Sequence, residues 1–522
     1  MRRTFPGLLL LAVVPALGQR VLHFKTRSIA SPAGAAVEMA DSPVPFGRGH
    51  LILQFNHAIS AETLAALRDR DVAVLGGVPD NGVLVALNHP VALTGLNVTY
   101  AAPVDPSDKI SPLISSGDSA AMNGYYLVEF HPDVDLNDAR GAVQSLGIEI
   151  AENPDLNPRH LMVHIGDSMQ VLPVLRSLAE QDPVAYIFPA SDDLASGVPT
   201  RPCEGALTSL GATTQLIPTY GPGWGGADHN AATIGYVFSQ LSDRVASGAA
   251  AAAIQRAMAV WAGVVQVTWR QGSDATAAQT VNILFASGDH GDGYPFTSSA
   301  ILAHTFFPAP PNPEPIAGDM HFNADESWQI GANTDVFSVA LHELGHALGL
   351  GHSDNPADVM YPYYKMVTGL NSGDTATVLT LYPPAQVASP APPVSPAPGP
   401  TPAPAPPPTP APAPTPAPTP KPAPPSNPTG SDTTPPSLTI TSPGGTSVSA
   451  SSSSLAFAGT ATDNVGVASV TWSTNTGSSG TASGTAHWSA SIPLLTGSNT
   501  VTIRATDGAG NSSWRTVVVS RH

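Results

Sequence analysis

The chain has 522 residues, of which 42% are hydrophobic and only 11% are charged, and its 47 glycines and 55 prolines predict long loops or linkers. Its formal net charge of −18 argues against nucleic acid or an anionic membrane as the main binding partner. With a single cysteine the chain can form no intramolecular disulfide, so stability must come from hydrophobic cores or bound metal ions.

The first 18 residues have the pattern of a secretory signal peptide. Arg2 and Arg3 precede an apolar segment, residues 7–18, that is too short to span a bilayer, and small residues at its end suit a cleavage site. A buried N-terminal strand is the alternative. No later apolar run reaches the roughly 18 residues that a membrane helix needs. We therefore expect a secreted, extracellular protein without a transmembrane anchor.

Residues 45–200 contain a repeated pattern. In each copy, short β-rich runs alternate with a stretch of helical periodicity, beginning with LILQF at 51–55 and with YLVEF at 126–130. This alternation predicts two small α+β modules with antiparallel sheets. Neither copy contains a cluster of His, Asp or Glu that resembles a site, so we expect a structural or inhibitory role.

Residues 205–384 hold nearly all the candidate chemistry and also have an α+β pattern. Period-2 and apolar runs predict strands at 232–239, 265–271, 281–287, 301–307 and 319–323. Helical periodicity predicts helices at 249–265, 335–350 and 374–382. Ser372 is a plausible N-cap for the last of these helices.

Two further segments complete the chain. Residues 385–431 are predicted to be a linker, because 21 of the 39 residues from 390 to 428 are proline and no core can form there. We expect a polyproline II spacer reaching up to roughly 120 Å, at about 3.1 Å per residue. Residues 432–522 alternate Ser or Thr with β-branched residues between turn signals, which predicts an all-β sandwich. This segment resembles the immunoglobulin-like modules of bacterial surface and secreted proteins, and the sequence leaves open whether it contacts a surface, a polymer or nothing.

The stretch HELGHALGLGHS, residues 342–353, sets three histidines at spacings of four and six. Four residues of a helix turn through about 400° and rise about 6 Å, so His342 and His346 project from one face and can hold one ion. His352 can join them only if the helix stops, and Gly349 can take the left-handed conformation that this reversal needs. Glu343 lies beside the first ligand, where its carboxylate can reach a water at the site without binding the metal.

Three neutral imidazoles leave a fourth tetrahedral position free, which is the arrangement of catalytic rather than structural zinc. Glu343 could then take a proton from water during attack on a peptide carbonyl and deliver it to the leaving amine. The alternative is a helix whose histidines merely pack or face solvent. Met360, eight residues after the third histidine, argues against this alternative because the longer pattern rarely matches by accident.

A second group of candidate ligands lies upstream. His290 and Asp292 are two residues apart on a Gly-rich loop, and His304 and His321 belong to separate β-like runs. Three histidines and one aspartate form a closed tetrahedral set, as expected for structural zinc. The alternative is that these are scattered polar loop residues.

The pattern HExxHxxGxxH with the segment VMYP resembles the metzincin metalloproteases, and most closely the matrixins, the matrix-metalloproteinase family. The resemblance implies a zinc-dependent endopeptidase acting on extended polypeptides, with a methionine turn at Met360 beneath the zinc. It also assigns the structural zinc to the HGD, LAH and HF motifs of the second group. Substrate would pair with an edge strand near residues 300–307, and residues 361–364 would form one wall of a side-chain pocket.

The resemblance also bears on calcium sites. Asp319 and Glu326 match family positions for structural calcium. Three other positions, Thr280, Thr297 and Asn323, carry a neutral residue where aspartate is usual. Losing charge weakens a site for a hard cation, so we expect weak or fewer calcium sites.

Cys203 lies in TRPCEG, just before residues 205–384. A thiolate is a good zinc ligand and could fill the open position until the segment is removed. Matrixins use such a cysteine switch, but with arginine directly before the cysteine, whereas here Arg201 is one place farther away and Glu204 follows. An incidental free thiol is the alternative to a latency switch. The upstream modules loosely resemble the α+β propeptides of secreted proteases, so we expect them to assist folding or cover the cleft.

The sequence therefore predicts a secreted zinc endopeptidase made as a precursor. One alternative is an inactive, adhesin-like binding protein, and the intact Glu343 argues against it. The other is a different metzincin subgroup, and His352 followed by serine, with the HGDGYPF loop, argues against that.

Overall fold

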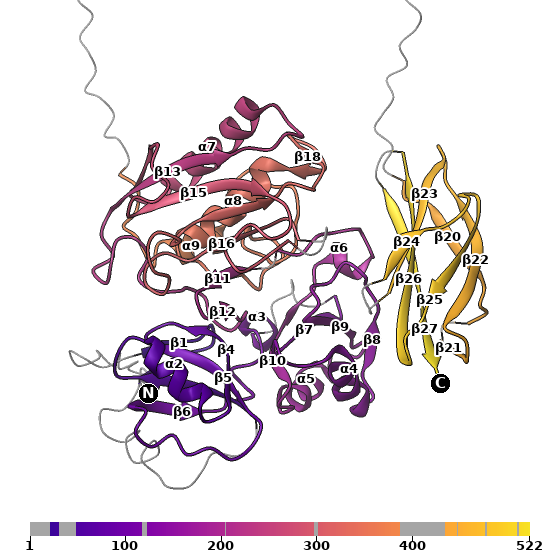
Figure 1. Cartoon of the computed structure of the whole chain (residues 1–522), viewed down its shortest axis with the longest axis horizontal. Coiled ribbons are helices and arrows are strands. Elements are labelled where there is room, and N and C mark those ends of the chain that lie inside the picture. The colour runs from indigo at the N-terminus through magenta and orange to yellow at the C-terminus, as the bar shows by residue number, and fades with distance from the viewer. Residues whose placement is uncertain are drawn as a thin grey trace, which may run out of the picture.

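The computed structural model describes residues 21–30, 49–116, 123–203, 205–296, 301–386, 434–445, 447–474, 478–508 and 511–522. They form two N-terminal α+β modules, a central domain built on a larger sheet, and a C-terminal β-sandwich (Figure 1). The predicted signal peptide, residues 1–18, and the proline-rich run 390–428 lie outside the described residues. Within the described ranges no helix combines the length and the apolar character that crossing a bilayer requires.

Each N-terminal module is a four-stranded antiparallel sheet with helices. The first has sheet order β4-β5-β3-β6 and consists of β3 (Gly49–Phe55), α2 (Ala61–Arg68), β4 (Val72–Val78), β5 (Gly82–Leu87) and β6 (Val98–Ala102). The second has order β10-β7-β9-β8 and consists of β7 (Tyr125–Phe130), α4 (Leu136–Ser145), β8 (Glu149–Ala151), β9 (His160–His164), α5 (Val171–Ala179) and β10 (Val184–Pro189). Shorter elements connected to them are β1 (Val21–His23), β2 (Ser28–Ala30), α3 (Pro112–Ser115) and α6 (Asp192–Ala195).

The sheet of the second module is covered on both faces. Tyr126 and Val128 of β7 pack in a core with α4 and α5, whereas Leu127, between them, packs with Tyr361 and Tyr363 of the central domain. Successive side chains of a strand point to opposite faces, so the near-continuous apolar run of β7 fits a strand that is buried on both sides. The second module therefore lies directly against the central domain.

The N-terminal hairpin, β1 with β2, also joins the modules to the central domain. Leu22 is buried in the same cluster as Tyr361. The ammonium of Lys25 forms an ion pair with Asp354 at 2.5 Å, and both side chains are almost fully buried. The hairpin thus contacts the loop that follows the third predicted zinc ligand.

The central domain is built on a seven-stranded mixed sheet in the order β12-β11-β16-β17-β15-β13-β14. Its strands are β11 (Ala206–Thr208), β12 (Gly211–Ala212), β13 (Ala232–Gln240), β14 (Val267–Gln271), β15 (Thr280–Ala286), β16 (Ala303–Phe306) and β17 (Met320–Asn323). Its helices are α7 (Ser247–Ala262), α8 (Val336–Ala347) and α9 (Ser372–Val378), and a small sheet pairs β18 (Trp328–Gln329) with β19 (Thr334–Asp335). Within the large sheet, β16 is antiparallel to β17 and parallel to β11.

The core of the central domain lies between the sheet and the two long helices. Trp261 of α7 is fully buried and its indole N–H donates to Leu341 O of α8 at 2.9 Å, which satisfies its polar atom inside the core. Asn371, rather than the predicted Ser372, is the N-cap of α9, where it forms a capping box with Asp374. Asn371 is favoured as the N-cap because its side chain accepts a hydrogen bond from a backbone N–H of the first helical turn. The side chain of Asp374 in turn accepts from the backbone N–H of Asn371.

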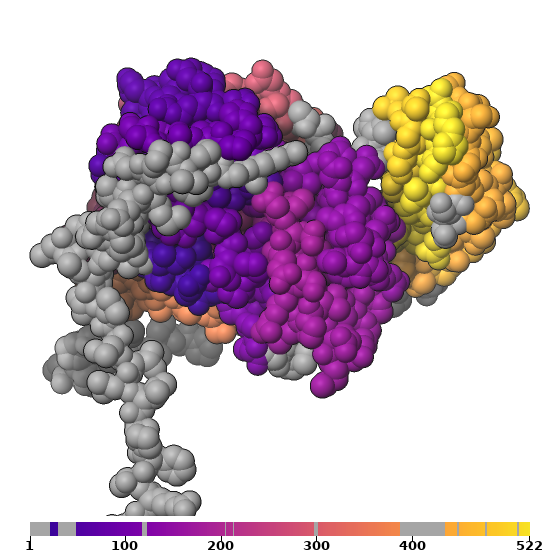
Figure 2. Space-filling view, turned by 90° about the horizontal axis from the view of Figure 1, so that it is seen from below, coloured from indigo at the N-terminus to yellow at the C-terminus, as the bar shows by residue number. Residues whose placement is uncertain are grey.

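The C-terminal residues form two packed sheets, β20-β22-β25 and β21-β27-β26-β23-β24. The strands are β20 (Ser437–Ser442), β21 (Ser447–Ala450), β22 (Ser454–Thr462), β23 (Val467–Thr474), β24 (Ser479–Thr481), β25 (His487–Pro493), β26 (Gly497–Asp507) and β27 (Ser512–Arg521). A shared core with Phe457, Trp488 and Ile503 confirms the predicted all-β sandwich. The sandwich stands beside the second module (Figure 2). Arg504 of the sandwich pairs there with Asp155.

Candidate active site

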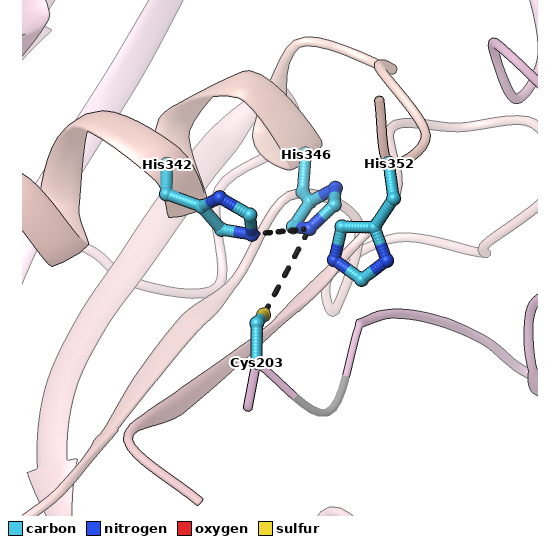
Figure 3. Close-up of side chains that lie close together, drawn as sticks. All are labelled: Cys203, His342, His346 and His352. Carbon is cyan, nitrogen blue, oxygen red and sulfur yellow. Dashed lines mark hydrogen bonds between the residues drawn. The ribbon is translucent and has the colours of Figure 1, made fainter. Parts of the chain in front are cut away.

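Helix α8 and the turn after it bring three histidines together (Figure 3). His342 and His346 lie one turn apart on α8, which is buried along its whole length. Gly349 follows the helix with φ of 105°, in the left-handed region that glycine adopts without strain. The chain therefore turns back at this point, and the ring of His352 lies beside the other two imidazoles.

Hydrogen bonds set the tautomers of the two helical histidines. Nδ1 of His342 lies 2.7 Å from Val359 O, and Nδ1 of His346 lies 2.7 Å from Leu350 O. A carbonyl oxygen only accepts, so both Nδ1 atoms carry the proton and both Nε2 atoms keep a free lone pair. These two Nε2 atoms face each other at 3.1 Å. Lone pairs at that distance repel unless a cation is shared between them, so the donor set fits a metal ion.

Burial keeps all three imidazoles in the neutral form that binds metals. It lowers the pKa of His342 to about 4 and holds the pKa of His346 and of His352 well below the usual range. Among the residues that the structure describes, the buried Nε2 of His352 has no hydrogen-bond partner. All three rings therefore direct a ring nitrogen toward the same small volume.

Cys203 is the fourth member of this cluster. Its Sγ lies 4.0 Å from Nε2 of His346 (Figure 3), and the ligand atoms of the four residues all lie within 4.8 Å of one another. Its backbone N–H donates to Pro362 O at 2.9 Å, which fixes the approach of the segment. Three imidazoles and one thiol are a zinc-type donor set, and here they would close the coordination shell.

Glu343 lies between this cluster and the central sheet. Its Oε1 accepts from Cys203 Sγ at 3.3 Å, and its Oε2 accepts from the hydroxyl of Thr305 on β16 at 2.6 Å. Burial raises the pKa of Glu343 to about 7, although these two hydrogen bonds oppose the rise. A carboxyl group with a pKa near neutral can accept a proton and return it.

Met360 lies underneath α8. A Cβ added at Gly345 would meet its Sδ at 2.2 Å, so only glycine lets the helix approach the sulfur this closely. Gly345 directly precedes His346 in the sequence. The sulfur therefore packs against the helix turn that carries His346.

The second predicted group also comes together, and its four members form the other candidate metal cluster among the described residues. Oδ2 of Asp292 lies 2.9 Å from Nε2 of His290, 2.8 Å from Nε2 of His304 and 2.7 Å from Nδ1 of His321. Burial raises the pKa of Asp292, but the hydrogen bonds from His304 and His321 outweigh it and hold the pKa below its usual range. One carboxylate oxygen crowded by three ring nitrogens fits a bound cation better than it fits three protonated rings.

Asp319 and Glu326, the predicted calcium residues, lie in different surroundings. Asp319 accepts from the N–H of Asn282 at 2.7 Å, and burial raises its pKa to about 7. Glu326 is buried and pairs with Arg201 at 2.6 Å. Within the described ranges, neither residue belongs to a cluster of three or more acidic, His or Cys ligands.

The cleft beside the histidines is occupied by the segment that carries Cys203. Strand β11 pairs with the edge of β16, with Ala206 opposite Thr305. On the other side, Pro202 forms a bridge with Tyr363. The segment therefore runs between β16 and residues 361–364, where the resemblance places a substrate.

The second N-terminal module contacts the same wall through residues that the sequence did not single out. The hydroxyl of Tyr363 lies 2.7 Å from Nδ1 of the buried His160, and the hydroxyl of Tyr361 donates to Pro189 O at 3.0 Å. No local pattern marks such contacts, because the partners are 203 and 172 residues apart. A small cavity of ≈ 30 Å³ remains beside Glu343, lined in part by the two tyrosines and Lys365.

Comparison with known proteins agrees with this geometry. The family model described as Matrixin matches residues 227–383, and that described as Bacterial Ig domain matches residues 436–505. Karilysin of Tannerella forsythia is 37% identical over 160 residues, covering 30% of this chain and 34% of that protein. Matrix metalloproteinase-16 of Homo sapiens is 36% identical over 172 residues, covering 30% and 28%. Stromelysin-2 of Rattus norvegicus is 42% identical over 137 residues, covering 25% and 28%.

The chain thus spans about a third of the length of the curated relatives it matches. The matched region contains both histidine clusters but begins after Cys203 and after the two N-terminal modules. The expectations of a matrixin domain and of an immunoglobulin-like module are confirmed by these matches. The chain accordingly carries a matrixin domain of the metzincin class, followed by a bacterial immunoglobulin-like domain.

Proposed function

We propose that the protein is a secreted, zinc-dependent endopeptidase made as a latent precursor. The observation that carries this proposal is the convergence of three imidazole nitrogens, from His342, His346 and His352, beside the carboxylate of Glu343. The names of the relatives, matrix metalloproteinase-16 among them, point to the same class of activity. The pattern of a signal peptide at residues 1–18 supports export.

The histidines would hold the catalytic zinc, and their Nδ1–H···O=C bonds would fix the ring orientations. Zinc in such a site acts as a Lewis acid toward a substrate carbonyl and makes bound water more acidic. Glu343 would accept the proton of the attacking water on Oε1, the oxygen that faces Cys203 in this structure, and then deliver it to the leaving amine. The pKa of Glu343, raised by burial to about 7, suits both transfers near neutral pH.

The second cluster would hold a structural zinc. His290, Asp292, His304 and His321 supply four ligand atoms with no vertex left for a substrate, which is the arrangement of a closed site. Because His304 and His321 lie opposite each other on β16 and β17, an ion here would join the two strands next to the cleft. Its role would be to stiffen the edge strand rather than to take part in catalysis.

Latency would come from the segment around Cys203 and from the N-terminal modules. The thiol takes the position that water needs, and β11 occupies the edge of β16 that an extended substrate would use. The second module covers Tyr361 and Tyr363 of the pocket wall. Full activity would therefore require removal of residues up to and including this segment, and the modules would act as a propeptide.

The test is hydrolysis of a casein or gelatin film by the processed protein. We expect clearing that a chelator abolishes, that Glu343→Ala abolishes, and that Glu314→Ala, a change at an exposed glutamate that belongs to neither cluster, leaves intact. Zinc content should be the same in the two variants. A processed, zinc-loaded wild-type protein that clears no film and cleaves no peptide library would instead favour a binding protein with an inactive core.

A further inference from the structure

Strand β16 contributes neighbouring residues to both histidine clusters. His304 and Thr305 are adjacent on β16, and both are fully buried. Nε2 of His304 lies 2.8 Å from Oδ2 of Asp292, in the second cluster. The hydroxyl of Thr305 donates to Oε2 of Glu343 at 2.6 Å, beside the first cluster. Successive side chains of a strand point to opposite faces, so this division follows from the strand itself.

The carboxylate of Glu343 is held at both of its oxygens. Thr305 donates to Oε2, while Cys203 donates to Oε1 across 3.3 Å. The terminal torsion of a glutamate is broad, so a carboxylate held at one oxygen or none can rotate among many orientations. Removal of the segment that carries Cys203 would free Oε1 and leave the bond from Thr305 in place.

We propose that Thr305 is a positioning residue for Glu343, an inference that rests on the proposed function. By holding Oε2, the threonine fixes the plane of the carboxylate and keeps Oε1 directed at the place that Cys203 leaves. A base held in one orientation before substrate arrives does not have to be ordered during the reaction.

The strand that carries Thr305 has a second strand partner besides β11. Thr305 is paired with Ala206 of β11 on one side and with Met320 of β17 on the other. Loss of the β11 pairing would still leave the pairing with β17 and the anchor of His304 in the second cluster. The hydroxyl of Thr305 therefore keeps its place relative to α8 when substrate replaces the segment.

The experiment compares Thr305→Val and Thr305→Ser in the processed, zinc-loaded protein. Valine keeps the volume of threonine but cannot donate, so we expect kcat to fall by about 10- to 100-fold with KM nearly unchanged. Serine keeps the hydroxyl and should restore kcat to within roughly threefold of wild type. Thr377→Val, which removes a hydroxyl bonded within helix α9, is the matched control and should not change kcat.

A second readout does not depend on activity. The infrared carboxylate band assigned to Glu343, from the difference between wild type and Glu343→Gln, should shift in Thr305→Val and return in Thr305→Ser. An unshifted band, or a kcat in Thr305→Val equal to wild type, overturns the proposal. Loss of zinc or of stability in Thr305→Val that fully accounts for lower activity also overturns it, because the residue would then be structural. If wild type itself is inactive while the band shifts, the proposed function fails but the contact stands.

Discussion

The thiol of Cys203 donates to the carboxylate of Glu343 at 3.3 Å, so the proposed base and the proposed latency thiol are in direct contact. The same sulfur lies 4.0 Å from His346. The sequence departs from the matrixin switch motif around this cysteine, yet the thiol lies in one cluster with the three imidazoles, which supports the proposed switch. Arg201 lies one position farther from the cysteine than the arginine of the matrixin motif, and it pairs with Glu326 of the central domain.

The first prediction concerns this thiol. Cys203→Ala in the unprocessed precursor removes the proposed fourth zinc ligand and leaves the rest of the segment, so we expect hydrolysis of a short fluorogenic peptide to rise about tenfold or more. Cys203→Ser serves as a second variant that keeps a polar atom. Equal rates in wild type and both variants would show that the thiol is incidental.

Acidification should loosen the contact between the second module and the pocket wall. Burial lowers the pKa of His160 to about 3 from an ordinary value of 6.5, so the folded precursor favours the neutral ring. At pH values above the histidine pKa of the unfolded chain, the lowered pKa of the folded state costs no stability. Below that pKa the unfolded chain binds a proton that the folded chain does not, so the free energy of unfolding decreases as the pH falls. At pH 5 this cost is on the order of 2 kcal/mol.

The measurement is urea unfolding of the precursor at pH 7 and pH 5. His160→Gln should show a smaller loss between these values than wild type, whereas His89→Gln, a change at an exposed histidine, should not differ from wild type. A wild-type midpoint that rises on acidification would contradict the assigned direction.

Removing Asp292 should empty the second cluster only. Asp292→Ala takes away the oxygen shared by three imidazoles, and we expect about one zinc ion per chain to be lost, with a lower melting temperature. The first cluster should keep its metal because no ligand is shared. Elemental analysis with thermal unfolding checks this, and retention of the full zinc content in the variant would refute the assignment.

Calcium should add little stability. Glu326 pairs with Arg201, and Asn323 stands where charge would be needed, so we expect only weak calcium binding. Thermal unfolding of the calcium-free protein should not change on addition of micromolar calcium. A clear rise in melting temperature at that concentration would show the expectation to be mistaken.

Much of this site could be predicted from local sequence. The spacing of His342 and His346 predicts one helix face, and Gly349 predicts the reversal, because both depend on the nearest few residues. The C-terminal sandwich follows in the same way from its alternating pattern, and the matrixin match covers the region where the motifs lie.

The contacts that depend on tertiary packing could not be predicted. In the sequence Thr305 has the pattern of an ordinary strand residue, and only the packing of β16 against α8 brings it to Glu343. The residues around His160 likewise do not indicate its contact with Tyr363. The pairing of β11 with β16 likewise joins segments far apart in the chain. In each case the packing of two elements determines which residues are in contact. A short window of sequence does not contain this information.

The central claim is that His342, His346 and His352 hold one zinc ion, with Cys203 as the fourth ligand of the precursor. Anomalous diffraction from precursor crystals at the zinc absorption edge tests it most directly. We predict one peak among the three imidazoles within bonding distance of the sulfur, and a second at Asp292. The absence of a peak among the three imidazoles in zinc-saturated crystals would contradict the account.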